Sequence, residues 1–492
     1  MSKSYIQIHP NDNVVVALTA LPRGTQIEVG TSTVICKEDI PEGHKIAIKN
    51  LQPEEQIIKY GFAIGKATHS IAKGSWVNEK DVQTNLSGLE TYVYHPVRYS
   101  NPYSFENHSF KGYRRKNGKV GIRNEIWIIP TVGCVNSVVQ RLAEEMKEET
   151  GSNNFIAFTH NYGCSQLGED HENTRIILRN MALHPNAGGV LIVGLGCENN
   201  QPDKFRLLLG DYDKERIRIM VCQNVSDEIE EGKKVLRDLY DQTLHDERTD
   251  IPLSELKVGL KCGGSDGFSG ITANPLLGEF SDYLIAQGGT AVLTEVPEMF
   301  GAETILMNRC RNEQLFLKTV NMINDFKNYY LSHGEPIGEN PSPGNKKGGI
   351  STLEEKSLGC TQKGGTSEVT DVLKYGECLK TAGLNLLSAP GNDLVASTAL
   401  AASGCHLILF TTGRGTPFGT FVPTVKISTN TNLYQNKPHW IDFDAGILTK
   451  KPMDEVIQMF IQAIIDIING HPAWNEKNEY HDFSIFKTGV TL

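Results

Sequence analysis

The pattern of hydrophobic and polar positions changes twice along the chain. Over residues 1–85, short stretches of alternating apolar and polar residues are separated by turns of similar composition, LPRGT, IPEGH and IAKGS. Alternation with a period of two is typical of β-strands, and frequent turns with Gly and Pro leave no room for helices. The pattern predicts a small all-β module at residues 1–85.

The next two stretches differ in composition and period. Residues 86–110 are rich in Tyr, Ser, Asn and Pro without a clear period, so we expect a linker whose tyrosines lie on a surface. From 111 to 250, apolar runs alternate with helical stretches, which is the pattern of βαβ units around a parallel sheet. Strands are expected at 125–130, 154–159, 189–193 and 217–222, with helices such as 137–149 and 174–184 between them.

A second α/β region is predicted over residues 251–492. Its strands are expected at 257–262, 290–294, 384–387, 406–410 and 425–428, with one long helix at 303–331. The last helix, at 453–468, is followed by an Asn-Gly pair and then by a proline, which are typical signals of a helix end. The predicted fold class is therefore a multidomain α/β protein with an N-terminal all-β module.

Composition narrows the class of protein. A chain of 492 residues is too long for one ordinary core, so two to four domains are expected. The formal net charge of −10 argues against general nucleic-acid binding. No apolar run reaches the ~18 residues that span a bilayer. The start, MSKSYIQIHPNDN, lacks the apolar core of a signal peptide, so we expect a cytoplasmic protein with no membrane partner.

Four of the ten cysteines stand out. A cytosolic chain of this length needs no disulfides, and most of its thiols are expected to be buried and free. Cys134, Cys164, Cys197 and Cys262 differ because each lies in or beside a glycine-bearing turn after an apolar strand. Ligands bind at the carboxyl ends of strands in such sheets, and thiolates favour iron, zinc or an iron–sulfur cluster. The alternative is that these cysteines are small residues packed against glycine loops, and the residues alone leave both open.

The loop KCGGSDGFSG at 261–270 contains G-x-S-x-G, the pattern of a hydrolase nucleophile elbow. An elbow needs a helix directly after the serine, whereas Gly267, Gly270 and Pro275 oppose one. No phosphate-binding P-loop sequence is present either. The loop is better interpreted as a metal or anion site, to which Asp266 and Glu295 add carboxylates.

Cations lie on two further loops. Lys346 and Lys347 belong to PSPGNKKGG, and Arg414 belongs to TTGRGTP, directly after an apolar strand. Positive charges on tight loops suit a carboxylate or phosphate ligand, and an arginine can bind it with two hydrogen bonds. For the lysines, a solvated surface pair is an equally good reading.

Several of these stretches together resemble the altronate/galactarate dehydratase family. The resemblance covers nearly the whole chain and is carried by EGHK, TVGCVN, HNYGCSQLGEDH, VGLGCENNQ, CGGSDGFSGITANP, TEVPEMFGAE, NPSPGNKKGGI, LGCTQK and TTGRGTPFGTFVPT. The EDH that follows YGCSQLG and the LGCTQK stretch are similar to the altronate branch of the family rather than the galactarate branch.

The resemblance implies a domain order and an activity. It implies a β-clip module of the SAF type at 1–85, a linker at 86–110, a middle α/β domain at 111–250 that dimerises in the family, and a catalytic domain at 251–492 with a variant Rossmann-like sheet. It implies a homodimeric hydro-lyase that uses Fe²⁺, with Mn²⁺ as a possible substitute, and converts D-altronate to 2-dehydro-3-deoxy-D-gluconate in hexuronate catabolism. The alternatives are a dehydratase of a related sugar acid such as galactarate, and a non-catalytic sugar-acid-binding protein on the same scaffold.

For the chemistry we expect His44 and His160 to act as acid and base, because imidazole titrates near neutral pH. His44 can do so only if the β module folds back over the α/β site. Lys346 and Arg414 are expected to hold the substrate carboxylate. Further substrate contacts are expected from Ser265, Asn345, Lys347 and Thr416. Metal ligands are expected among Cys134, Cys164, Cys197, Cys262, Asp266 and Glu295, which hold either a single iron ion or an iron–sulfur cluster.

Overall fold

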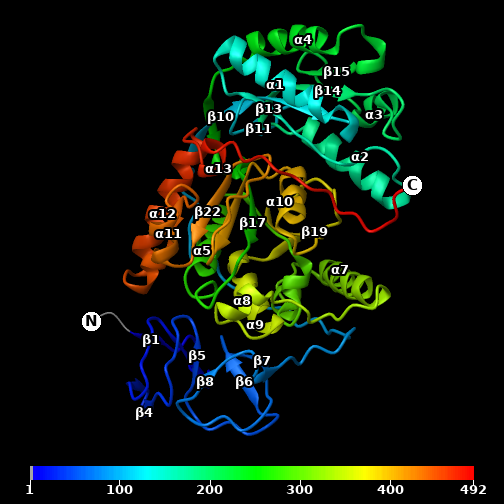
Figure 1. The fold of residues 1–492 in the computed structure, drawn as a ribbon. Helices are drawn as coiled ribbons and strands as arrows, with labels where there is room; N and C mark the ends of the chain where they lie inside the picture. Colours follow the sequence, from blue (N-terminus) through cyan, green and yellow to red (C-terminus); the bar gives the residue numbers. More distant parts are fainter. Residues whose placement is uncertain (1–3) are drawn as a thin grey trace.

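A computed structural model describes residues 4–492 of the chain, and Figure 1 follows it from an N-terminal β module to the α/β parts above it. The module contains only strands among its described residues, as predicted. They are β1 (Tyr5–Ile6), β2 (Val14–Ala17), β3 (Gln26–Val29), β4 (Ser32–Ile35), β5 (Lys45–Ala47), β6 (Gln56–Lys59), β7 (Phe62–Ala67), β8 (Trp76–Val77) and β9 (Val82–Gln83). They form the antiparallel sheets β1-β2-β5-β8, β3-β4 and β6-β7-β9.

The hydrophobic packing of the module continues into the C-terminal part of the chain. One of its two hydrophobic clusters, around Val14 and Ile57, also contains Ala302 and Leu358 from the C-terminal part of the chain. Because shared apolar burial resists separation, the module is packed onto the α/β part rather than tethered beside it.

The predicted linker has no helix or strand within the described residues 84–108. Its tyrosines hold it on a surface, as expected: the hydroxyl of Tyr94 donates to the carbonyl of Cys310 at 2.6 Å, and the hydroxyl of Tyr103 donates to Glu279 at 2.8 Å. The linker therefore runs along the C-terminal domain on its way to the middle domain.

The middle domain is built on the parallel sheet β13-β12-β14-β15. Its strands are β12 (Glu125–Pro130), β13 (Phe155–Ala157), β14 (Ala187–Gly194) and β15 (Ile217–Val221). Its helices are α1 (Asn136–Thr150), α2 (Gly168–Ala182), α3 (Pro202–Leu209) and α4 (Glu228–Thr243). A small antiparallel sheet, β11-β10-β16, joins both ends of the domain through β10 (Ser109–Arg114), β11 (Val120–Gly121) and β16 (Thr249–Pro252).

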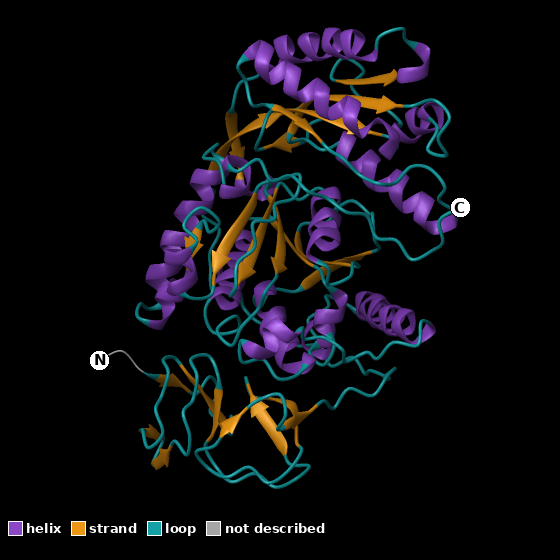
Figure 2. Cartoon of the chain, in the orientation of Figure 1, coloured by secondary structure: helices purple, strands orange, loops and turns teal. Residues whose placement is uncertain are grey.

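Helices cover both faces of the middle sheet (Figure 2). Alternate residues of β12 point to opposite faces, so Ile128 packs with α1 and α4 while Trp127 packs with α2 and α3. The Trp127 cluster continues into Leu400 and Ile408 of the C-terminal domain. The two α/β domains therefore share one continuous hydrophobic core.

The C-terminal domain is built on a seven-stranded parallel sheet in the order β19-β20-β18-β17-β21-β22-β23. The strands are β17 (Lys257–Cys262), β18 (Thr290–Leu293), β19 (Val369–Leu373), β20 (Gly383–Leu387), β21 (Leu407–Thr412), β22 (Thr424–Ser428) and β23 (Phe443–Asp444). The predicted α/β class with a large parallel sheet is thus confirmed. Strands β18 to β20 are added on one side of β17, and strands β21 to β23 are added on the other side. The strands β17 and β21 are therefore neighbours although β18, β19 and β20 lie between them in the sequence.

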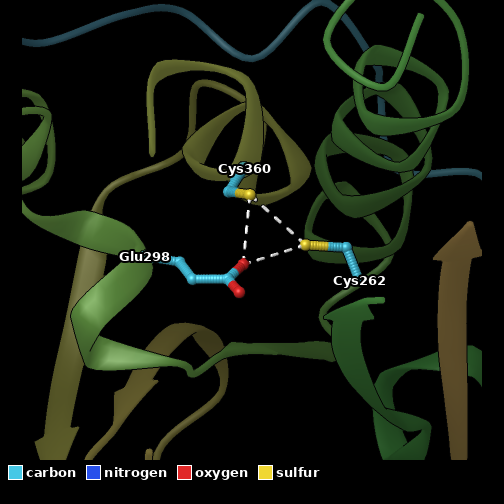
Figure 3. Close-up of side chains that lie close together, drawn as sticks. All are labelled: Cys262, Glu298 and Cys360. Atoms are coloured by element: carbon cyan, nitrogen blue, oxygen red, sulfur yellow. Dashed lines mark hydrogen bonds between the residues drawn. The ribbon is translucent and has the colours of Figure 1, made fainter. Parts of the chain in front are cut away.

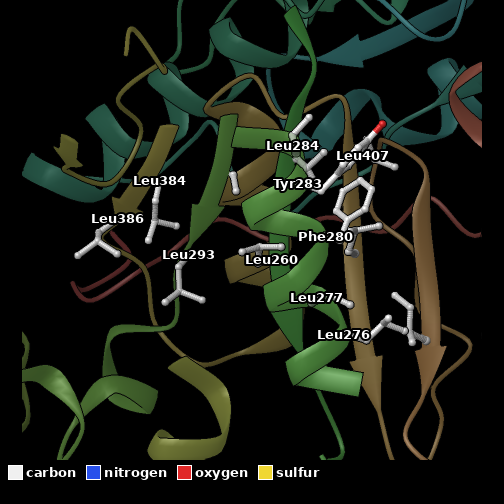
Figure 4. Packing of buried hydrophobic residues seen from close by; sticks show 14 of the residues in the cluster. Leu260, Leu276, Leu277, Phe280, Tyr283, Leu284, Leu293, Leu384, Leu386 and Leu407 are labelled. Atoms are coloured by element: carbon white, nitrogen blue, oxygen red, sulfur yellow. The ribbon is translucent and has the colours of Figure 1, made fainter. Parts of the chain in front are cut away.

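Helices α5 and α10 lie on opposite faces of this sheet. Figure 4 shows Leu276, Leu277 and Phe280 of α5 packed against Leu260 and its neighbouring strands. The helices are α5 (Ala273–Ala286), α6 (Glu303–Met307), α7 (Glu313–Ser332), α8 (Pro343–Lys347), α9 (Leu353–Cys360), α10 (Asp393–Ala402), α11 (Thr431–Asn436), α12 (Met453–Ile468) and α13 (Trp474–Lys477). Among the described residues, no helix combines the length and the apolar character needed to cross a membrane.

The long helix predicted at 303–331 is wrong as a single element, because the structure divides it into α6 and α7. The break is made by Asn312, whose side-chain oxygen accepts a hydrogen bond from the main-chain N–H of Leu315 at 2.9 Å. Asparagine is a favoured N-cap because it satisfies an N–H group that the first helical turn leaves free.

Candidate active site

The loops that follow β17 and β21 meet at the carboxyl edge of the C-terminal sheet. The N–H of Gly263 donates to the carbonyl of Thr411 at 3.0 Å, and the N–H of Gly413 donates to the carbonyl of Gly264, also at 3.0 Å. A point where neighbouring strands are not consecutive in the chain is where open α/β sheets bind their ligands. The KCGGSDG and TTGRGTP loops therefore form one edge of a site, as their positions after strands had suggested.

A cavity of about 510 Å³ opens at this edge. Its charged and thiol-bearing walls come from separate elements: Cys262 from the end of β17, Glu298 from the turn after β18, Lys346 from α8, Lys356 from α9 and Asp393 from the start of α10. The cavity thus gathers cations, carboxylates and a thiol, and its two lysines suit a small anionic ligand.

Cys262 and Glu298, which line the cavity, lie in contact with a second thiol, that of Cys360 (Figure 3). The sulfur atoms of Cys262 and Cys360 are 3.3 Å apart, and each lies 3.2 Å from the same oxygen of Glu298. All three residues are buried. Burial and the hydrogen bond with Cys262 raise the pKa of the Cys360 thiol well above its ordinary value, with the hydrogen bond as the larger cause.

Lysines surround this cluster. Lys363 Nζ donates to the sulfur of Cys262 at 2.8 Å, and Lys356 Nζ donates to Glu298 at 2.8 Å. Burial alone would raise the pKa of Glu298, but Lys356 and the other lysines hold it at about 2. Lys261 pairs with Glu295, whose pKa is raised chiefly by its burial. The thiol–carboxylate cluster therefore lies within a buried network of alternating charges.

The cluster of Cys262, Glu298 and Cys360 fits a metal ion by its donors. Two sulfur atoms and a carboxylate oxygen suit iron or zinc, and in the part of the chain that the structure describes this is the group whose three ligand atoms lie within 4.8 Å of one another. Lys363 contacts the sulfur of Cys262, and Lys356 contacts the second oxygen of Glu298, so an ion at this place would compete with Lys363 and lie close to Lys356. Ionisation of both thiols on binding supplies the compensating negative charge.

The NPSPGNKKGG loop forms the cationic side of the cavity. Asn345 donates from its side-chain nitrogen to the carbonyl of Ser265 at 2.8 Å, and its side-chain oxygen accepts from the hydroxyl of Ser342 at 2.9 Å. These bonds fix α8 against the CGGSDG loop and direct Lys346 to the cavity wall. Arg414 lies beside the same loop, since a side chain added at Gly344 would meet the Arg414 Nε at 3.7 Å.

The β module does reach this site. The N–H at Nε2 of His44 donates to the carbonyl of Lys347 at 3.3 Å, while its Nδ1 accepts from the indole of Trp76 at 3.0 Å. Burial and then the nearby Lys45 lower the pKa of His44. The approach is close enough that a Cβ on Gly267 would lie 1.9 Å from a carbonyl of the module, so only glycine is accommodated there. In this arrangement Nε2 of His44 supports the loop of Lys346, while Trp76 of the module holds the ring through Nδ1.

A buried ion triad secures the module in place. Lys45 and Lys59 from the module lie 2.9 and 2.7 Å from the carboxylate of Glu355 in α9. Burial would raise the pKa of Glu355, but the two lysines hold it at about 2. Lys45 also donates to the carbonyl of Gly349 at 2.7 Å. The module therefore positions the NPSPGNKKGG loop through hydrogen bonds from His44 and Lys45 to main-chain carbonyls of that loop.

Other predicted site residues have different surroundings. Asp266 accepts hydrogen bonds from Thr429 and Asn430, and burial raises its pKa, so it shapes the loop from within. Ser265 is buried. Lys347 is exposed, and the Thr416 hydroxyl accepts from the N–H of Phe418. The predicted roles of these residues stay predictions.

The structure does not bring the middle-domain residues to this cavity. Cys134, Cys164 and Cys197 lie at the carboxyl edge of the other parallel sheet. His160 lies there too, with Nε2 donating to the carbonyl of Pro130 and Nδ1 accepting from the N–H of Tyr162. Burial lowers the pKa of His160 to about 4.

Sequence reasoning missed the residues that complete the cluster. Glu298 and Cys360 stand in TEVPEMFGAE and LGCTQK, stretches that had drawn attention as motifs without a role for these two residues. Lys363 stands in the same LGCTQK stretch, whereas Lys356 and Asp393 gave no signal, because a charged residue in a helical or turn segment is normally solvated. The burial of Lys356 depends on the packing of α9 against the turn after β18.

Comparison with known proteins connects this geometry to a family. Models of the family match the chain in three consecutive parts: the "Altronate/galactarate dehydratase SAF domain" at 3–85, the "D-galactarate dehydratase/Altronate hydrolase, second domain" at 112–243, and the "D-galactarate/Altronate dehydratase, C-terminal" at 253–491. The chain belongs to the altronate/galactarate dehydratase family. The C-terminal family model covers every residue of the cavity and of the thiol–carboxylate cluster.

Individual members of the family are similar over the full length. The chain is 57% identical to an altronate dehydratase of Bacillus subtilis, with all of both chains covered, and 56% identical to an altronate dehydratase of Escherichia coli, with 99% of this chain and 100% of the relative covered. It is 34% identical to a galactarate dehydratase (L-threo-forming) of E. coli over 95% of this chain and 93% of the relative. The chain is accordingly an enzyme, a hydro-lyase of the altronate/galactarate dehydratase family.

Proposed function

We propose that this chain removes water from D-altronate to give 2-dehydro-3-deoxy-D-gluconate, a step of hexuronate catabolism. The observation that carries the proposal is a cavity that combines Lys346 and Lys356 with the Cys262–Glu298–Cys360 cluster at the ligand-binding edge of the sheet. The substrate is supported by the 56–57% identity to altronate dehydratases, against 34% to a galactarate dehydratase.

The reaction sets clear demands on the site. The C2–H bond breaks and its electrons form a C2–C3 double bond as the C3 hydroxyl leaves; the hydroxyl takes up a proton and departs as water. The resulting enol then gains a proton at C3 while its C2 hydroxyl loses one, and it becomes the 2-keto acid. Because the neighbouring carboxylate is already negative, removal of the C2 proton requires positive charge at that carboxylate.

The chain's own residues meet these demands as follows. Lys346 binds the substrate carboxylate, with Arg414 close to the same loop. Asp393 accepts the C2 proton: it lines the cavity, its side chain is 36% exposed, and Lys261 orients it at 2.8 Å. His44 holds the loop of Lys346 in place through the carbonyl of Lys347.

Fe²⁺ is the proposed cofactor, with Mn²⁺ as the alternative ion, and Cys262, Glu298 and Cys360 are the residues that would hold it. A bound ion of this kind supplies Lewis acidity for the carboxylate and for the leaving hydroxyl. The sulfur donors favour iron over manganese, which prefers oxygen. We also propose that the enzyme is a cytoplasmic homodimer joined through the middle domain; its ten free cysteines suit a reducing compartment.

The test is an anaerobic assay of the full chain loaded with Fe²⁺, in which D-altronate, galactarate and other sugar acids are offered separately and the 2-keto-3-deoxy product is measured. Conversion of D-altronate with the highest efficiency is expected. Higher efficiency on galactarate would reassign the substrate. Binding of altronate without any product would favour the non-catalytic alternative and overturn the proposal.

A further inference from the structure

The carboxyl edge of the middle-domain sheet carries a group of thiols that the dehydratase cavity does not use. The neighbouring strands β12, β13 and β14 are each followed by a loop with one cysteine, Cys134, Cys164 and Cys197. All three are free and exposed. Unpaired cysteines are normally among the most buried residues, and exposed thiols are open to oxidation. Three exposed thiols at one ligand-binding edge therefore indicate a ligand.

Main-chain hydrogen bonds join the three loops to one another. The N–H of Gly133 donates to the carbonyl of Tyr162 at 3.0 Å, which connects the loop of Cys134 to that of Cys164. The N–H of Asn200 donates to the carbonyl of Gly163 at 2.9 Å, which connects the loop of Cys164 to that of Cys197. The three loops that carry the cysteines are thus joined to one another by backbone contacts.

The backbone around Cys164 has an unusual conformation. Cys164 lies between Gly163 with φ of 98° and Ser165 with φ of 58°, and the left-handed region is costly for a serine. The N–H of Gly163 donates to the side chain of Gln166 at 3.0 Å and that of Ser165 donates to the side chain of Asn199 at 2.8 Å, so neighbouring side chains hold this backbone in place. Gln223 also donates from its side-chain nitrogen to the sulfur of Cys197 at 3.5 Å.

The last residues of the chain hold the Cys164 loop from the other side. The N–H groups of Thr488 and Gly489 donate to the carboxylate of Asp170 at 2.8 and 2.7 Å, and the N–H of Leu492 donates to the carbonyl of Ser165 at 2.9 Å. Figure 1 shows this end of the chain beside α2. A strained loop held by such distant contacts is the kind of backbone that a binding site retains.

We propose that Cys134, Cys164 and Cys197 bind an iron–sulfur cluster, in a second site separate from the dehydratase cavity. A single ion fits less well, because within residues 4–492 the three sulfur atoms do not all lie within 4.8 Å of one another. An iron–sulfur cluster spans a wider gap and is held by cysteine thiolates.

A structural zinc site would also need a fourth protein ligand, and the near candidate Glu198 is committed elsewhere. The carboxylate of Glu198 accepts from the N–H groups of Leu195 and Gly196 and from the hydroxyl of Thr131. Glu198 is therefore not free to complete a tetrahedral site.

The test is anaerobic reconstitution of the full chain with Fe²⁺ and sulfide, followed by iron and acid-labile sulfide analysis and a visible absorption spectrum. The native sequence is expected to take up sulfide and to show a charge-transfer band. Cys134→Ser, Cys164→Ser and Cys197→Ser should each lose most of both signals while keeping the thermal melting point. Cys378→Ser, a half-buried thiol outside the group, is the matched control and should keep them.

Two further measurements separate this site from the dehydratase site and from misfolding. Cys262→Ser and Cys360→Ser should keep the sulfide signal while losing altronate turnover, so that failure of one proposal leaves the other intact. In the native sequence, the cluster should protect Cys134, Cys164 and Cys197, but not Cys378, from alkylation. The proposal is overturned if the native protein takes up no sulfide, or if it binds zinc but no sulfide. It is also overturned if Cys134→Ser, Cys164→Ser and Cys197→Ser retain the charge-transfer band.

Discussion

The sulfur atoms of Cys262 and Cys360 lie 3.3 Å apart, although 98 positions separate the two residues in the chain. Cys262 ends β17 and Cys360 ends α9, and Glu298 joins them with one carboxylate oxygen. The arrangement concentrates three metal-ligating atoms beside a cavity that also contains Lys346. It ties the metal requirement of the proposed reaction to a particular pair of thiols.

The first prediction concerns that pair. Cys360→Ser replaces a soft sulfur donor by a weakly acidic hydroxyl, and we expect iron affinity to fall by at least the ten- to hundredfold seen for supporting residues of metal sites. Altronate turnover should fall in parallel. Cys310→Ser, a buried thiol outside the cluster that contacts Thr319, is the control. Equilibrium iron binding measures the effect, and unchanged iron affinity in Cys360→Ser would remove it from the ligand set.

The second prediction uses two adjacent lysines. Lys346 lines the cavity, whereas Lys347 is exposed and does not. Lys346→Gln should lose a charge-assisted contact with the substrate carboxylate, a loss of about 2–4 kcal/mol or roughly thirty- to a thousandfold in kcat/KM. Lys347→Gln should change kcat/KM only slightly. Equal losses in both variants would mean that the charge of the loop, rather than the contact, matters.

The third prediction concerns proton transfer. Asp393→Asn keeps the size of the side chain but removes the proton acceptor, so kcat should fall by roughly 10²–10⁴ while KM changes little. The C2-deuterated substrate should also show a larger isotope effect on kcat in the variant. Asp454→Asn, an exposed aspartate of α12, is the control. A variant with normal kcat would assign the base to another residue.

The fourth prediction concerns the junction of the β module. Glu355→Gln leaves Lys45 and Lys59 buried without their carboxylate, and loss of one partner of a buried ion group costs about 3–5 kcal/mol. Urea unfolding should show this loss, and limited proteolysis should release the module more readily. Glu54→Gln, whose ion pair with Lys66 is at the surface, should cost about 1 kcal/mol or less.

The fifth prediction is a dependence on pH. Glu355 has an ordinary pKa of 4.5 and a pKa of about 2 in the folded protein, so its contribution to stability is fully present above pH 4.5. That contribution is lost as the pH falls toward 2, when the carboxyl is protonated and leaves the two lysines. Urea midpoints measured between pH 5 and 2 should fall less steeply for Glu355→Gln than for the native sequence. If the urea midpoints of the two proteins fall in parallel as the pH is lowered, Glu355 is not the group responsible for this loss of stability.

The local pattern of apolar and polar residues predicts most helices and strands. It does not predict where each one ends or which others it contacts. The apolar run before KCGGSDG predicts β17, because a buried parallel strand must be apolar on both faces. The helix expected at 303–331 failed at Asn312, since helical periodicity on both sides of a cap looks continuous in sequence.

In the candidate site, too, the sequence predicts where a residue lies in its own element but not which residues it contacts. Cys262 was expected to meet Cys134, Cys164 and Cys197, because all four share the same sequence context after a strand. The structure distributes them over two sheets and brings Cys360, from a helix, to Cys262 instead. Sequence context says that a residue lies at the end of a strand, and it does not say which sheet contains that strand.

By itself, the sequence determined the all-β module, the two α/β regions, the glycine loops at strand ends and, through its motifs, membership of the dehydratase family. Only the tertiary structure decided that Glu298 and Cys360 complete a cluster with Cys262, and that His44 supports the loop of Lys346. The physical reason is that propensity and periodicity act over a few residues. Which side chains meet depends on strand order and on the burial of whole faces, and these are properties of the folded chain.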